Sequence, residues 1–300
     1  MTRPKASARP PISVVFATRQ PSAHVGSHLQ TIEEQVRAVG GEVVVVDGCG
    51  QALPGEPDDV LSWVKSPGSD VYELRALGAA RARGDVVAYT EDHCAVAPDW
   101  CERILRAHRE RPDVEMIAGA VVNGSEERVI DRANFLMVHA ANLPPLRDTP
   151  DDWVPSSANV SFKRAVMPDR VPEPGWVEYV LTAELIHSGR VMLDDRIRVT
   201  HVQSYGVFGT VMNHYHAARS VAGLLRVLSP TVGRRVLARA ALAFPYRQPR
   251  RALRTVRRKP GCGPGLGRLL VPMIVLAGSA AIGLFMGAVA GVGASRQRLR

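Results

Sequence analysis

Glu91, Asp92 and His93 form a polar triplet with a clear chemical use. They follow residues 85–90, an apolar run typical of a buried strand. Glu91 and His93 are two residues apart, so their side chains point to the same side if the strand continues. A carboxylate and an imidazole there can hold a divalent cation that also binds a diphosphate. The alternative is a solvated turn that caps a helix.

Two other predicted strands also end in polar residues. The strand predicted at 12–17 is followed by Thr18 and Arg19, and the strand at 43–46 by Asp47. Because ligands of doubly wound sheets bind beyond the carboxyl ends of the strands, Arg19, Asp47 and the triplet at 91–93 are expected to line one crevice.

The elements that must position these residues follow from hydrophobic spacing. Continuous valine runs favour a parallel sheet covered on both faces, and alternating strands and helices favour a doubly wound α/β fold. Further strands are predicted at 116–122 and 159–164. Helices are predicted at 24–39, 71–83, 99–109, 177–188 and, with many arginines, within 206–260.

Several enzyme classes are excluded by missing motifs. The turn after the first strand, Thr18-Arg19-Gln20-Pro21, contains no GxGxxG, and neither GxxxxGK[ST] nor GxSxG occurs in the sequence. Dinucleotide oxidoreductases, P-loop NTPases and α/β-hydrolases are therefore disfavoured. The four cysteines have no CxxC spacing, which argues against the usual structural zinc sites.

The sequence around the triplet resembles family-2 glycosyltransferases, which have the GT-A fold. In that family, Ala-Arg-Asn-x-Gly and Ala-x-Gly-Glu precede an apolar strand that ends in Asp-x-Asp. Arg75, Gly78 and Gly84 fall at matching positions, and residues 91–93 take the place of Asp-x-Asp. Glu and His replace the two outer acids here. The resemblance implies Mg²⁺ or Mn²⁺, although imidazole suits Mg²⁺ poorly.

The resemblance covers residues 11–125 well and 126–205 loosely. It implies a metal-dependent, inverting enzyme that moves a sugar from a nucleotide sugar to a hydroxyl, glycan or lipid-linked acceptor. The implied donor-binding residues are Thr18, Arg19, Asp47, Arg75 and Asp92. The implied metal ligands are Glu91, His93 and His201.

The resemblance also implies a catalytic base. Glu178 follows Gly175-Trp176-Val177 and matches the acidic region that takes a proton from the acceptor. Glu184 is a weaker candidate for the same role.

Four of the assigned residues have a structural alternative to their functional role. Asp47 would be an ordinary acid in a turn, and Arg75 a solvated helix residue. Glu178 becomes a first-turn acid that favours the helix dipole. His201 becomes a buried, hydrogen-bonded histidine.

The charge distribution is strongly asymmetric. Residues 1–205 hold 22 Lys and Arg against 29 acids, whereas residues 206–300 hold 16 basic residues and no acid. The basic part leads into an uncharged run of 27 residues from Leu269 to Ser295, long enough to cross a bilayer. A buried core helix is the alternative. This pattern indicates contact with an anionic membrane surface and not with nucleic acid.

The uncharged run predicts a single transmembrane helix. Its N-terminal flank is the more basic one, which favours a cell-membrane protein with a cytoplasmic catalytic domain. Glycines at 283, 287 and 291 have the spacing of a helix-pairing face, which would support a homodimer. The expected organisation is a flexible tail at 1–10, a GT-A domain at 11–205, basic membrane-surface helices at 206–268, the transmembrane helix at 269–295 and a basic tail at 296–300.

Two other functions remain open at the level of the sequence. One is an enzyme that transfers sugar specifically to a polyprenyl phosphate. The other is a non-catalytic, membrane-tethered protein that binds nucleotide sugars, because the triplet departs from the family's pattern.

Overall fold

The computed structural model describes residues 9–19, 22–50, 57–146, 155–168, 177–203, 205–228, 233–260 and 265–299. Residue contacts divide the chain into two units. The first comprises Met1–Pro67, Tyr72–Gly119 and Ser157–Val199, and the second comprises Gly68–Val71, Ala120–Ser156 and Thr200–Arg300. Residues 120–156 thus group with the C-terminal helices, a division that the expected boundary at residue 205 does not follow.

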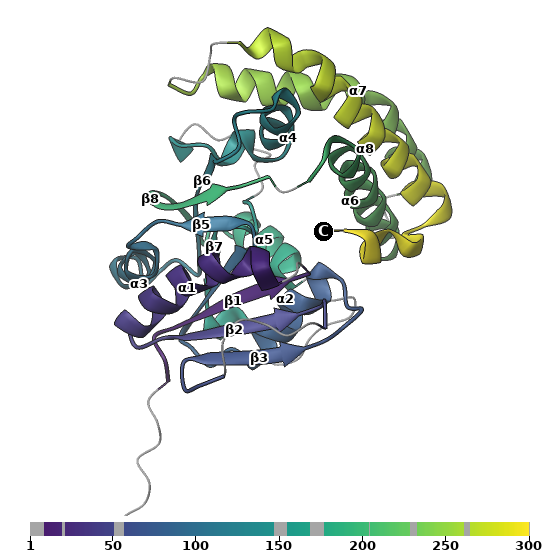
Figure 1. Ribbon diagram of the computed structural model, residues 1–300. Helices are drawn as coiled ribbons and strands as arrows, with labels where there is room; N and C mark the ends of the chain where they lie inside the picture. Colours follow the sequence, from purple (N-terminus) through teal and green to yellow (C-terminus); the bar gives the residue numbers. More distant parts are fainter. Residues whose placement is uncertain are drawn as a thin grey trace, which may run out of the picture. The chain divides into compact units, whose positions relative to one another are not determined.

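Within the described residues, eight strands form one sheet in the order β3-β2-β1-β4-β7-β6-β8-β5 (Figure 1). Their bounds are β1 Ile12–Thr18, β2 Glu42–Asp47, β3 Leu61–Lys65, β4 Val86–Glu91, β5 Cys94–Val96, β6 Met116–Asn123, β7 Val160–Lys163 and β8 Val191–His201. The pairs β1/β2, β2/β3 and β1/β4 are parallel, whereas β7 is antiparallel to β4 and β6. The prediction was a doubly wound, mostly parallel α/β sheet. The α/β fold is confirmed, and the sheet is mixed because β7 runs antiparallel to both of its neighbours.

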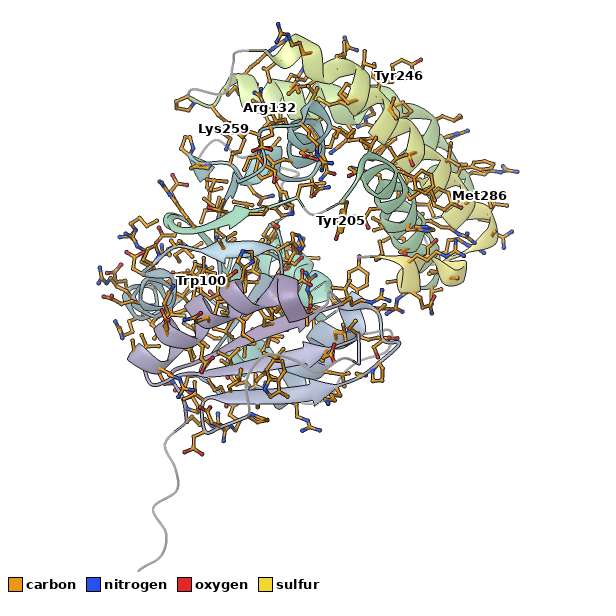
Figure 2. All side chains as sticks on the ribbon, in the orientation of Figure 1. Trp100, Arg132, Tyr205, Tyr246, Lys259 and Met286 are labelled. Carbon is orange, nitrogen blue, oxygen red and sulfur yellow. The ribbon has the colours of Figure 1, made fainter. Side chains whose placement is uncertain are left out.

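Helices cover the sheet of the first unit. They are α1 Ser22–Ala38, α2 Val71–Arg81, α3 Trp100–Glu110 and α5 Val177–His187. The valine runs are buried as predicted: every residue of β1 and β2 is buried. On α3, the fully buried Trp100 donates its indole N–H to Asn159 Oδ1 at 2.9 Å, which ties the helix to the start of β7 (Figure 2).

Gly78 explains how closely α2 lies on the sheet. A Cβ atom at this position would come within 2.4 Å of Val15 Cγ1 in β1. On the same helix, Leu74 packs against Ala17, Val44 and Val46. The family-like glycine in this helix is therefore required by close packing, and the packing fixes where the rest of α2 can place its side chains.

A buried polar network joins the beginnings of three strands. Ser13 Oγ donates to Glu42 Oε1 at 2.5 Å, and the Arg83 amide donates to the same oxygen at 2.6 Å. The Gly84 amide donates to Ser13 Oγ at 2.7 Å. A Cβ atom on Gly84 would lie 2.5 Å from the Ser13 amide nitrogen, so only glycine fits this turn into β4 without a shift of the backbone.

Substitution at this turn tests the network. We expect Gly84→Ala to lower the free energy of unfolding by roughly 1–3 kcal/mol, the usual cost of overpacking, because the methyl group meets backbone atoms. The control is Ala165→Gly at an exposed residue, and we expect it to lower the free energy of unfolding by less than about 1 kcal/mol. Gly68→Ala would not serve as a control, because Gly68 has a φ of 86°, which strains any residue with a side chain. Urea titration measures both, and equal losses would contradict the argument.

The second unit is built mainly from helices. They are α4 Val129–His139, α6 Val207–Leu228, α7 Arg234–Arg257 and α8 Leu270–Ala290. α8 packs along α6 and α7 and also touches α4. α8 contains the apolar run, and among the described residues the segment Leu266–Ala290 is the one helix long and apolar enough to cross a membrane. The α8 helix ends at Ala290, five residues before the end of the predicted span.

The glycine face of α8 is used inside the chain. A Cβ atom at Gly283 would lie 2.2 Å from the carbonyl oxygen of Tyr215 in α6, and one at Gly287 would lie 2.5 Å from the carbonyl oxygen of Arg219. The predicted close helix approach thus occurs, but its partner is α6. This contact occupies the face that the sequence analysis assigned to a second copy of the chain.

Basic side chains of α6 donate hydrogen bonds to carbonyl oxygens at the C-terminus of α8. Arg219 Nε donates to the carbonyl oxygen of Gly291 at 3.1 Å, and Arg226 donates to that of Val289 at 3.2 Å. Guanidinium groups at a helix C-terminus satisfy free carbonyls and oppose the negative end of the helix dipole. Two of the arginines in the basic segment therefore have a structural role.

Candidate functional site

The strand ends that the sequence singled out meet at one edge of the sheet in the first unit. In the parallel register, Thr18 of β1 stands beside Asp47 of β2, and Ala17 stands beside Glu91 of β4. The three strands therefore finish at the same level. Glu91 ends β4 at this level, and Asp92 and His93 form the turn between β4 and β5.

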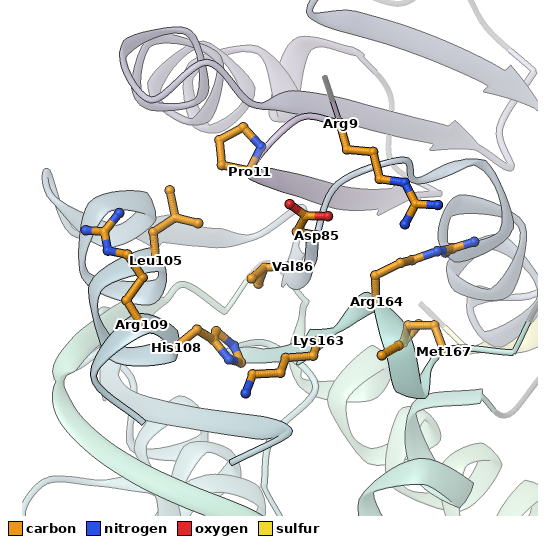
Figure 3. Close-up of a pocket in the computed structure, with 11 residues that line it drawn as sticks. Arg9, Pro11, Asp85, Val86, Leu105, His108, Arg109, Lys163, Arg164 and Met167 are labelled. Atoms are coloured by element: carbon orange, nitrogen blue, oxygen red, sulfur yellow. The ribbon is translucent and has the colours of Figure 1, made fainter. Parts of the chain in front are cut away.

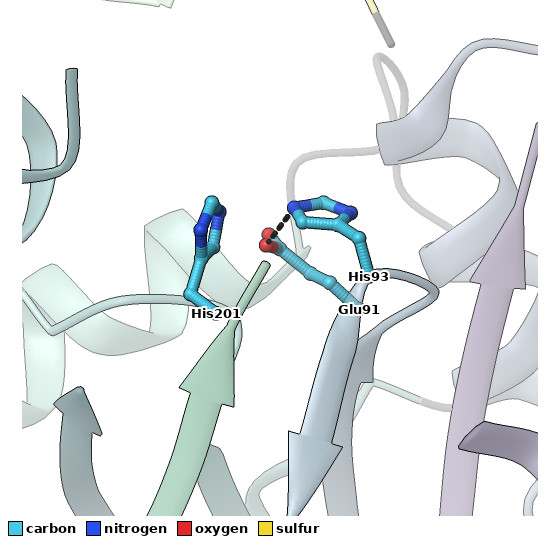
Figure 4. A group of neighbouring side chains, drawn as sticks. All are labelled: Glu91, His93 and His201. Atoms are coloured by element: carbon cyan, nitrogen blue, oxygen red, sulfur yellow. Dashed lines mark ion pairs between the residues drawn. The ribbon is translucent and has the colours of Figure 1, made fainter. Parts of the chain in front are cut away.

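His93 contacts both carboxylates of the triplet. Its Nδ1 lies 2.8 Å from Asp92 Oδ1. Its Nε2 lies 3.2 Å from Glu91 Oε2, the pair that Figure 4 marks with a dashed line. The side chains are 11–19% exposed. Burial alone would lower the pKa of His93, but the hydrogen bonds and charges of Asp92 and Glu91 outweigh it and raise that pKa to about 10. Below that pH, an imidazolium therefore bridges two carboxylates.

Arg75 provides a second cation for Glu91. Its guanidinium lies 2.6 Å from Glu91 Oε1 and donates a hydrogen bond to Ser157 Oγ at 3.0 Å. Arg75 is only 5% exposed, so the alternative of a solvated helix residue is wrong. The Glu91 carboxylate thus lies between a guanidinium from α2 and the ring of His93.

Asp92 is oriented from two directions. Thr18 Oγ1 donates to Asp92 Oδ2 at 2.8 Å, while Asp92 Oδ1 contacts His93. His28 Nδ1 in α1 lies 3.1 Å from the Asp92 carbonyl oxygen. Both carboxylate oxygens of Asp92 are therefore engaged, and its side chain links the end of β1 to the turn after β4.

The Asp47 carboxylate caps its own turn. Asp47 is fully buried, and its two oxygens accept hydrogen bonds from the amides of Cys49 at 2.7 Å and Gly50 at 3.0 Å. These hydrogen bonds fit the structural alternative for Asp47, an ordinary acid that orders a turn. Its contact with a nucleotide base stays a prediction.

His201 is the last residue of β8 and belongs to the second unit. It is 6% exposed, and its ring centroid lies 4.8 Å from that of His139 and 6.1 Å from that of Phe135. Glu91, His93 and His201 each offer an atom able to ligate a cation, and Figure 4 draws the three side chains. The buried alternative for His201 fits the ring contacts, and its role toward a metal stays a prediction.

The structure says less about three other predicted residues. Glu178 is the second residue of α5, but its side chain lies outside the described residues, as do Gly175 and Trp176. Arg19 directly follows β1 and is half-buried. Glu184 is exposed on α5.

The donor atoms of the triplet fit a hard divalent cation. Two carboxylates supply the oxygen ligands that Mg²⁺ and Mn²⁺ prefer, and the imidazole favours Mn²⁺ over Mg²⁺. Both His93 nitrogens contact carboxylates here, so the ring must release a proton before it can ligate a metal. The residues present therefore fit a cation that competes with the proton on His93.

Sequence reasoning missed Ser157 and His28. Ser157 lies in a segment rich in Pro and Asp with no periodicity, and His28 is one polar residue on an amphipathic helix. Neither carries a local signal, since each meets its partner across more than 60 residues of sequence.

Replacement of His93 has a pH-dependent cost. The pKa of the ring rises from 6.5 to about 10 on folding, so its stabilisation is complete below pH 6.5 and is lost as pH rises through 10. We expect His93→Gln to lower the free energy of unfolding by roughly 1–3 kcal/mol at pH 6 and by far less at pH 10.5. Urea titration at both pH values measures this.

The control is His187→Gln, at an exposed histidine of α5 in the same unit. We expect this variant to stay within about 0.5 kcal/mol of the parent at both pH values. An equal loss at pH 6 and pH 10.5 for His93→Gln would mean that the ring is not charged in the folded protein.

Comparison with known proteins gives one relative by sequence. Glucosyl-dolichyl phosphate glucuronosyltransferase from Haloferax volcanii is 31% identical over 86 residues, which are 27% of this chain and 28% of that protein. The match thus spans about a quarter of the relative's length. No protein-family model matches the chain. The relative is a sugar transferase, which confirms the resemblance to glycosyltransferases.

Two solved structures with partial structural similarity to the chain are sugar-transferring enzymes. A mannosyltransferase from Pyrobaculum calidifontis, in complex with GDP-Man and Mn²⁺, is 18% identical, with a TM-score of 0.47 over 96% of this chain and 78% of the other. Glucosyl-3-phosphoglycerate synthase from Mycobacterium tuberculosis is 14% identical, with a TM-score of 0.44 over 69% and 80%.

Proposed function

We propose that this chain transfers a sugar from a nucleotide sugar to an acceptor hydroxyl with the help of a bound Mn²⁺ or Mg²⁺. The observation that carries the proposal is the cluster of Glu91, Asp92 and His93 at the carboxyl edge of the sheet, where α/β folds bind ligands. The name of the curated relative supports the same chemistry.

Each residue of the candidate site has a proposed role. Glu91, Asp92 and His93 would hold the cation, which neutralises the diphosphate leaving group when bound. Thr18, Arg19, Asp47 and Arg75 would contact the donor. Arg75 holds Glu91 in place through the 2.6 Å ion pair, so its first effect is to position a ligand.

Substitution of Glu91 tests the cation site. Glu91→Ala should abolish metal-dependent binding of nucleotide sugar, because it removes the ligand on which Arg75 and His93 converge. Calorimetric titration of UDP and GDP sugars with and without Mn²⁺ measures the effect. Glu102→Ala, at an exposed acid of α3 in the same unit, is the matched control and should bind like the parent. Donor binding by Glu91→Ala that still depends on Mn²⁺ would refute the assignment.

We further propose Glu178 as the base, with inversion at the sugar carbon. Its place in the first turn of α5 matches the family's acidic region, and a carboxylate there can take the proton of the acceptor hydroxyl. Glu178→Gln should reduce kcat by about 10²–10⁴-fold and leave donor binding intact. Glu184→Gln, on the same helix, controls for the loss of an acid. If Glu184→Gln alone is impaired, the base is Glu184.

We propose a lipid-linked acceptor, such as a polyprenyl phosphate or its sugar derivative. The curated relative is named for glucosyl-dolichyl phosphate. The second unit also exposes an apolar face on α8, with Val271, Ile274, Val275, Ile282, Phe285 and Val289 each 46–71% exposed. On α7, Leu242 and Tyr246 are exposed beside arginines, a combination suited to an anionic membrane surface (Figure 2).

We propose that α8 crosses the membrane once, with the first unit in the cytoplasm. The excess of basic residues before α8 supports this orientation. Protease added to sealed, right-side-out cells should then spare the first unit, and carbonate extraction should leave the chain in the membrane pellet. Release by carbonate would mean that the helices lie on the surface. Digestion from outside would reverse the orientation.

The alternative of a non-catalytic binding protein has its own outcome. It predicts that nucleotide sugar binds but is neither hydrolysed nor transferred with Mn²⁺ or Mg²⁺ present. Turnover of any donor excludes it.

A further inference from the structure

A cavity of about 790 Å³ lies in the first unit, at the opposite edge of the sheet from Glu91 (Figure 3). Pro11 and Val86 line it where β1 and β4 begin. Because β4 rises about 3.3 Å per residue, its first and last residues are roughly 17 Å apart. The cavity is therefore separate from the candidate site for the nucleotide sugar.

The wall of this cavity is rich in cations. Arg9, Arg109, Lys163 and Arg164 line it together with one carboxylate, Asp85. Within the described ranges, none of the four cations forms an ion pair with a carboxylate. Arg164 donates to the carbonyl oxygen of Ala79 and Lys163 to that of Pro112. Four cations against one carboxylate in the lining create a positive potential that attracts an anion.

His108 adds a buried polar atom without a partner. It is 6% exposed and lines the same cavity, and its Nε2 lies 3.0 Å from Ser161 Oγ. Its Nδ1 has no hydrogen-bond partner among the described residues. Buried polar atoms are nearly always satisfied, so Nδ1 needs a partner that the described residues do not supply.

We propose that this cavity is a second anion site, which binds a small molecule carrying a phosphoryl or diphosphate group. Its volume lies in the range of small-molecule sites, about 300–1,000 Å³. Guanidinium groups bind phosphate through paired hydrogen bonds. Leu105, Val86 and Met167 supply an apolar wall for the rest of the ligand. The site does not depend on the proposed sugar transfer.

The test uses the full chain in detergent with EDTA, so that no divalent cation can recruit an anion to the nucleotide-sugar site. Inorganic pyrophosphate and ribose 5-phosphate are the probes, and calorimetric titration is the measurement. Arg109→Ser removes an exposed cation of the cavity. We expect it to weaken binding of both probes about tenfold, the typical effect of losing a charge-assisted hydrogen bond.

Arg106→Ser is the matched control. Arg106 lies on the same helix as Arg109 and pairs with Glu102, but it does not line the cavity. It changes the net charge equally and should stay within about twofold of the parent if binding is local. Arg9→Ser provides a second variant from another segment, with the same expected loss as Arg109→Ser.

Three outcomes would overturn the proposal. They are no binding of pyrophosphate to the parent at millimolar concentration, equal losses in Arg109→Ser and Arg106→Ser, and unchanged binding in both cavity variants. Thermal unfolding without ligand checks that each variant is folded. Because the titration needs no transfer activity, a failure of the proposed function leaves this result readable.

Discussion

The Glu91 carboxylate is the point on which the candidate site depends, because two cationic groups from different parts of the chain converge on it. Arg75 reaches it from α2 and His93 from the following turn. A carboxylate that is only 19% exposed is costly unless it is paired, and loss of either cation would leave part of that cost uncompensated. The candidate cation site, the position of α2 and the end of β4 are therefore coupled through one side chain.

The packing of α2 makes that convergence possible. Gly78 lets the helix approach Val15 in β1, and the same helix carries Arg75. The network of Ser13, Glu42 and Gly84 fixes the opposite ends of the strands. The two edges of the sheet therefore differ in their side chains. The carboxyl edge holds carboxylates paired with cations, and the opposite edge holds the buried polar network and the basic cavity.

In the second unit, the small residues of α8 have a different packing partner from the one that their spacing suggested. Small residues on α8 permit close helix approach, and α6 of the same chain takes that place. The valine, isoleucine and phenylalanine residues of α8 are left exposed. A helix with one face buried against its neighbours and the other exposed and apolar is suited to contact with lipid.

The sequence by itself determined the strands β1, β2 and β4, because uninterrupted apolar runs are typical of buried parallel strands. It also identified the triplet at 91–93, since residue type and position after a strand are local properties. Only the tertiary structure decided that Arg75 is buried against Glu91, that Ser157 joins them and that α6 covers the α8 glycines. The short strands β3 and β5 and the helix α4 were also not predicted. The physical reason is that these features arise from contacts between residues far apart in sequence, and such contacts leave no periodicity in the local pattern.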